Sequence, residues 1–72
     1  MYGNSHSGLG ALLLLLVALL HKMLSTLHQW QTQHAHGFWF HGKYHHWKTR
    51  HGLMQAIGHV RHEIASVKHR LK

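Results

Sequence analysis

Histidine is the residue type that offers the most chemistry in this chain, at 12 of 72 residues. An imidazole nitrogen binds zinc or haem iron, provided several ligands converge. His59, His62 and His69 follow at intervals of three and seven, so a helix would place them on one face. We expect that face to point to water, where zinc binds adventitiously, so these three histidines are only a weak candidate metal site.

His21 and His28 form a second candidate because they adjoin a strongly apolar segment. Ionisable residues within a membrane helix usually face protein, a cofactor or a water path. One such histidine can hold haem or a chlorophyll-type pigment through its ring nitrogen. The simpler interpretation, which we favour, is that the side chains of His21 and Lys22 extend toward the lipid headgroups at the end of the segment.

The run VALLHKMLST, with Trp30 after it, is similar to the light-harvesting α-polypeptides, whose membrane helix carries a ligand histidine before small hydroxyl residues and a tryptophan. That resemblance implies pigment binding by His21. It covers residues 17–30 only, and the aromatic-rich middle and basic tail depart from the family, so we treat the resemblance as coincidence.

Few enzyme classes are compatible with this composition. Glu63 is the sole acidic side chain, which excludes paired-carboxylate catalysis and leaves one group to orient a histidine. The chain has no cysteine, which excludes disulfides and cysteine-ligated zinc. We therefore expect a non-enzymatic protein that requires no cofactor.

Residues 9–20 form an unbroken apolar run, and extension to Leu27 gives a helix of about 28 Å, against about 30 Å of hydrocarbon in a bilayer. Its Leu and Val side chains favour insertion by on the order of 3–7 kcal/mol, while a central lysine opposes insertion by about 2.5–3.5 kcal/mol. Two alternatives remain. A cleaved signal peptide would need basic residues before the run. A buried helix of a soluble bundle would need oligomerisation to cover its leucines.

The aromatic residues cluster in 30–47, directly after the apolar segment. Trp and Tyr concentrate where hydrocarbon meets water. We therefore predict membrane-interface positions for four of them: Trp30, Trp39, Tyr44 and Trp47. The alternative is that Phe38, Trp39 and Phe40 fill a small soluble core, and a short β-hairpin around Gly37 and Gly42 is compatible with either interpretation.

The segment 48–72 has the clearest periodicity in the chain. Its apolar residues recur at intervals of four and three, within an arc of about 80° on a helix. They are Leu53, Ile57, Val60, Ile64, Val67 and Leu71. A seam this narrow fits a partner helix or a membrane surface.

The formal net charge is +7, and every Lys and Arg lies at or after Lys22. Basic residues are dispersed and no nucleic-acid-binding motif is present, so anionic lipid headgroups are the better partner and nucleic acid is disfavoured. The positive-inside rule places the C-terminal part on the cytoplasmic or matrix side of a membrane. The mitochondrial inner membrane is compatible with this orientation.

These patterns predict an all-α protein in four segments: a flexible N-terminus at 1–8, an apolar helix that spans or embeds in a membrane at 9–29, an aromatic and histidine-rich connector at 30–47, and a basic amphipathic helix at 48–72. The favoured function is that of a single-span accessory subunit that stabilises a larger energy-transducing complex of other membrane subunits. One alternative is a histidine-rich, membrane-active cationic peptide. Another is a designed or selected soluble helical hairpin that forms homo-oligomers and binds haem or metal through histidine.

Overall fold

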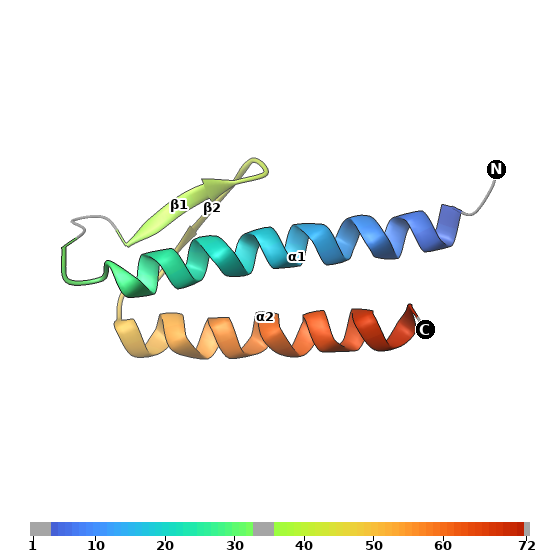
Figure 1. Ribbon diagram of the computed structural model, residues 1–72. Coiled ribbons are helices and arrows are strands. Elements are labelled where there is room, and N and C mark those ends of the chain that lie inside the picture. The colour runs from blue at the N-terminus through green and yellow to red at the C-terminus, as the bar shows by residue number, and fades with distance from the viewer. Residues whose placement is uncertain (1–3, 33–35, 72) are drawn as a thin grey trace.

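The chain folds into two long helices with a small β-hairpin between them, as the computed structural model shows (Figure 1). The structure describes residues 4–32 and 36–71. Residues 1–3 of the expected flexible N-terminus, 33–35 of the connector and Lys72 at the end of the basic segment lie outside the described residues. The fold is mostly helical, as the sequence predicts, and the hairpin falls within the predicted connector.

Helix α1 spans Asn4–His28, so it begins before the apolar run and takes in part of the polar segment that was expected to be flexible. The chain lacks proline, and the small polar residues before the run can join a helix that the leucines already stabilise. After His28 the chain leaves the helix through two tight turns, in which the N–H of Trp30 donates to Leu27 O and that of Thr32 donates to Gln29 O.

Helix α2 spans Arg50–Arg70 and has clear signals at both ends. Thr49 caps its N-terminus, since the Thr49 hydroxyl oxygen accepts a hydrogen bond from Gly52 N at 3.0 Å. Lys68, His69 and Arg70 occupy the last turn, where positive charge suits the negative end of the helix dipole. These signals account for the close agreement with the predicted 48–72 segment.

The two helices run antiparallel and enclose the core between them (Figure 1). Met23 of α1 is buried against Leu53, Ile57 and Val60 of α2. Partly buried side chains surround this cluster: Leu16, Leu19, Leu20, Leu24 and Leu27 from α1, with Ala56 and Ile64 from α2 and three aromatics from the connector. The α2 seam therefore has a partner helix, and that helix is α1 of the same chain.

Strands β1 (Gly37–Phe40) and β2 (Lys43–His46) pair antiparallel through the two-residue turn His41–Gly42. Both turn residues have positive φ, 51° for His41 and 77° for Gly42, which is the backbone of a type I′ hairpin turn. Gly37 is also required, because a Cβ there would lie 2.6 Å from the carbonyl oxygen of His45. The hairpin contacts α1 through Phe38, whose ring lies 5.9 Å from Lys22 Nζ.

Neighbouring residues on α2 provide a test of the helix pairing. Leu53 is 0% exposed and Met54 is 47% exposed. We expect Leu53→Ala to lower the free energy of unfolding by about 2–5 kcal/mol through loss of core contacts. Met54→Ala should change it by less than about 0.5 kcal/mol. Denaturant unfolding followed by circular dichroism in mild detergent measures both, and equal effects would contradict the antiparallel core.

Candidate membrane interface

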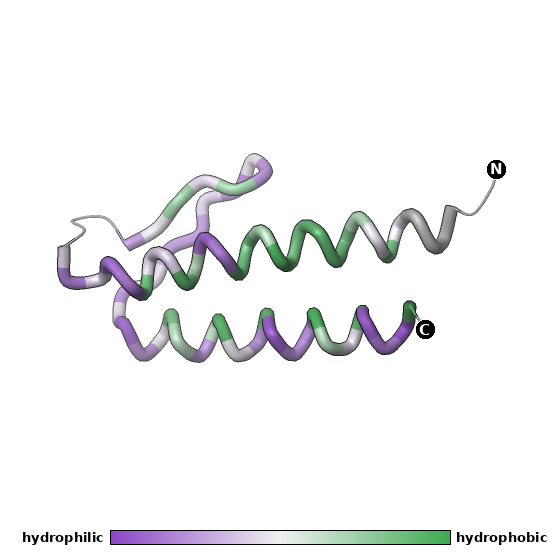
Figure 2. The backbone as a smooth tube through the Cα atoms, viewed as in Figure 1, coloured by the Kyte–Doolittle hydropathy of each residue, from purple (hydrophilic) through white to green (hydrophobic). Residues whose placement is uncertain are grey.

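The side of α1 that faces away from α2 is apolar in its N-terminal half. Leu14 on this side is 72% exposed, and Leu15 and, beside α2, Leu12 are also exposed large hydrophobic residues. Figure 2 shows apolar residues on every side of α1 along this stretch, whereas on α2 they face α1. One amphipathic helix cannot cover a helix that is apolar all round. The uncovered leucines are thus the main candidate for an interaction surface.

The same side of α1 becomes polar toward its C-terminus. His21, Lys22, Ser25 and His28 are all exposed there. His21 and His28 therefore lie on the outer surface of the hairpin rather than in the core that α2 encloses. Their position suits contact with headgroups at the end of an inserted segment.

The four predicted interface aromatics fall into two pairs. Trp30 and Trp47 are half-buried and pack against the helix core together with Phe38. Trp39 and Tyr44 are exposed, form a cross-strand pair and have ring centroids 5.4 Å apart. Trp39 and Tyr44 share one face of the hairpin, because successive side chains along a strand point to opposite faces. Of these four residues, Trp39 and Tyr44 are the two that present an open aromatic surface.

The histidines of α2 lie on its water-facing side. His59, His62 and His69 are all exposed. The first two border one shallow hollow with Gln55 and Gly58. Within residues 4–32 and 36–71, no group of three His, Asp or Glu side chains lies close enough to share a metal ion. The hollow can thus offer a metal ion two imidazoles from a single chain.

Two contacts in this region had no counterpart in the sequence patterns. The rings of Trp30 and His36 stack with centroids 3.5 Å apart, and His36 Nε2 lies 3.0 Å from Trp30 O. Thr26 is buried, and its hydroxyl donates to Lys22 O at 3.0 Å. This bond to its own helix satisfies the buried hydroxyl. In the sequence, the four-residue spacing between Lys22 and Thr26 was the only feature that could have indicated this hydrogen bond.

Antiparallel pairing brings the basic end of α2 beside the apolar end of α1. A cavity between the helices is bordered by Leu12 and Leu16 on one side and by His62, Glu63, Ser66, Val67 and Arg70 on the other. The paired helices therefore cannot cross a bilayer together, because charged side chains at the bilayer centre cost several kcal/mol each. A bilayer could therefore accommodate α1 across its hydrocarbon only without α2 beside it.

By length and composition, α1 is able to cross a membrane over Gly8–His28. Within the described chain, 6% of its apolar 18-residue stretch is buried. That segment is about 32 Å long, which matches a hydrocarbon core of about 30 Å.

Comparison with protein-family models, curated proteins and solved structures found no match.

The hairpin contains a histidine whose ionisation is coupled to its packing. Burial lowers the pKa of His45 below its ordinary 6.5, and the nearby Lys43 lowers it further. The His45 ring lies 5.8 Å from the Phe38 ring, on the hairpin face that contains Phe38 and Phe40. The folded hairpin thus favours neutral imidazole.

Acidification should therefore weaken the hairpin. Because the folded pKa of His45 is depressed, its stabilising contribution is complete above pH 6.5 and is lost as the pH falls from 6.5 toward the folded pKa. Amide hydrogen exchange of β1 and β2 on either side of pH 6.5 measures this loss. His45→Gln should remove that part of the pH dependence, and His46→Gln, on the exposed face, should retain it.

Proposed function

We propose that this chain is a small, non-enzymatic membrane protein, anchored by α1, that acts as an accessory subunit of a larger membrane complex. The observation that carries the proposal is the leucine surface of α1, of which the rest of the chain covers one side only. In water this surface destabilises the monomer, because exposed apolar area is unfavourable. Hydrocarbon removes that penalty without any further partner.

Insertion of α1 requires α2 to separate from it. The contacts between the helices come from apolar side chains, which lipid tails can replace for α1. α2 then lies along the headgroups, with its seam toward the lipid and its histidines toward water. Arg61, Lys68 and Arg70 attract anionic lipids in that position.

The orientation follows from the charge distribution. Because residues 1–21 contain no Lys or Arg, we infer that the N-terminal side of α1 crosses the bilayer and that α2 stays on the cytoplasmic or matrix side. The outward surface of α1, around Ala11, Leu14 and Ala18, is then available to another membrane subunit, since small residues permit close helix approach.

A second function is favoured by one observation, the antiparallel packing of α1 on α2. A soluble helical hairpin would keep this pairing and cover its leucines with a second copy. The radius of gyration, 14.1 Å, exceeds the roughly 11 Å of a compact chain of this length, so one copy alone encloses little core. The membrane-active peptide alternative instead requires residues 51–72 to act alone on vesicles.

The depth of α1 in a bilayer can be tested with two lysine variants on the same exposed side. Ala18 lies at the centre of Gly8–His28, and Ser25 lies two turns closer to its end. A central lysine costs about 2.5–3.5 kcal/mol, so Ala18→Lys should reduce membrane partitioning about 100-fold. Ser25→Lys should have little effect because its amine reaches the headgroups. Carbonate extraction of membranes that contain each variant measures the partition.

The wild-type chain should remain in the membrane pellet. If it is instead soluble in plain buffer as discrete oligomers by analytical ultracentrifugation, the membrane proposal is wrong and the soluble hairpin is correct. Equal loss of Ala18→Lys and Ser25→Lys from the pellet would also contradict insertion, because a surface-bound helix has no difference in depth between these positions.

A further inference from the structure

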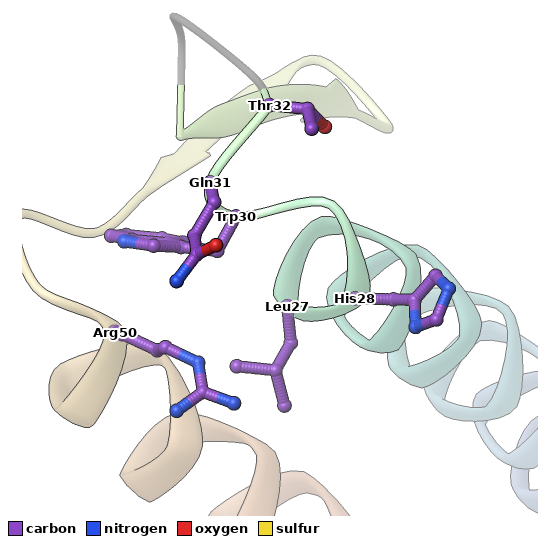
Figure 3. A pocket seen from close by; sticks show the side chains of 6 residues that line it. All are labelled: Leu27, His28, Trp30, Gln31, Thr32 and Arg50. Carbon is purple, nitrogen blue, oxygen red and sulfur yellow. The ribbon is translucent and has the colours of Figure 1, made fainter.

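A polar cavity lies at the end of the molecule where α1 stops and α2 begins. It has a volume of about 300 Å³ and is bordered by Leu27, His28, Trp30, Gln31, Thr32 and Arg50. Figure 3 shows the side chains of Arg50, Gln31 and Leu27 directed into the space between the two chain segments. This volume is at the lower end of the range for small-ligand sites, about 300–1,000 Å³.

Arg50 supplies a cation that no acidic side chain neutralises. Glu63 is the sole acidic side chain of the chain, and it lies about 20 Å away along α2 at 1.5 Å per residue. The guanidinium is exposed, always charged and arranged as a fork that matches the oxygens of a phosphate group. Its binding capacity is therefore available to a ligand.

The other walls of the cavity are fixed before any ligand arrives. The stack of Trp30 on His36 and the contact of His36 Nε2 with Trp30 O hold the indole in place. The Thr32 hydroxyl donates to Gln29 O, so Thr32 is not a donor toward the cavity. The Gln31 amide is the neutral donor beside Arg50, and Leu27 with Trp30 provides an apolar wall.

We propose that this cavity binds a phosphate group, with the Arg50 guanidinium and the Gln31 amide as donors and the Leu27–Trp30 wall against the organic part of the ligand. The inference rests on the proposed function, because insertion of Gly8–His28 places the cavity at headgroup depth, where lipid phosphates are concentrated. A free phosphate ester offers the same chemistry, and the experiment distinguishes the two sources.

The test compares two variants with the same charge change on the same helix. Arg50→Gln removes the cavity cation, and Arg61→Gln removes an exposed arginine of α2 that does not border this cavity. Binding of the full chain to phosphatidylcholine vesicles with and without phosphatidic acid is measured for both. Loss of general attraction to the anionic surface should weaken binding to phosphatidic acid vesicles about fivefold for Arg61→Gln. Arg50→Gln should weaken it about tenfold more than Arg61→Gln, because it also loses a charge-assisted hydrogen bond. Arg50→Lys, which keeps the charge and loses the fork, should be intermediate.

A second measurement follows the NMR signals of the Arg50 side chain and the Trp30 indole in detergent while glycerol phosphate is added. Saturable shifts in both signals that vanish in Arg50→Gln support the cavity. Displacement of the chain from phosphatidic acid vesicles by glycerol phosphate shows that the lipid phosphate occupies the same site, and saturable shifts without displacement identify a free phosphate ester as the ligand. Equal weakening by Arg50→Gln and Arg61→Gln, or no saturable shift, overturns the cavity site and leaves the membrane anchor intact. Absence of all vesicle binding by the wild-type chain overturns the proposed function, and the glycerol phosphate titration then decides the cavity site alone.

Discussion

An imbalance of apolar surface between the two helices governs this structure. α1 carries apolar side chains on every side over residues 9–20, whereas α2 offers a single narrow seam. Helix pairing therefore buries the apolar seam of α2 but leaves leucines of α1 exposed, Leu14 above all. Hydrophobic stabilisation is proportional to the apolar area removed from water. Packing on α1 therefore stabilises α2, whereas part of the apolar surface of α1 stays exposed to water.

The polar side of α2 determines that the two helices differ in whether they can enter hydrocarbon. Because Arg61, His62 and Glu63 are polar and exposed, α2 could not follow α1 into hydrocarbon. The same seam that packs on Met23 in the closed hairpin can lie on a lipid surface once α1 inserts. If α1 inserts as proposed, the same chain would form a closed pair in water and a separated pair in a membrane, and the surroundings of α1 would decide between them.

The connector keeps the two helices near each other in either arrangement. Its β-hairpin is anchored to α1 by Phe38 and to the core by Trp47, and the turns after His28 bring Trp30 close to the start of α2. The cavity at Arg50 lies where the connector joins the two helices, between the end of α1 and the start of α2. The exposed Trp39–Tyr44 pair adds an aromatic surface of the kind that settles at a membrane interface.

Several features were determined by the sequence alone. The apolar run specified a long helix, and the intervals between Leu53 and Leu71 specified an amphipathic one, because each depends only on the local helical period. A hairpin around Gly37 and Gly42 was compatible with the sequence but was not predicted from it, because the run Phe38–Phe40 is too short to show a period. The tertiary structure decided the rest. It placed α1 against the α2 seam, divided the four interface aromatics into core and surface pairs, and joined Arg50 to Trp30 in one cavity. These results depend on contacts between residues far apart in the chain, and the period of a helix or strand says which side chains share a face but not what that face meets.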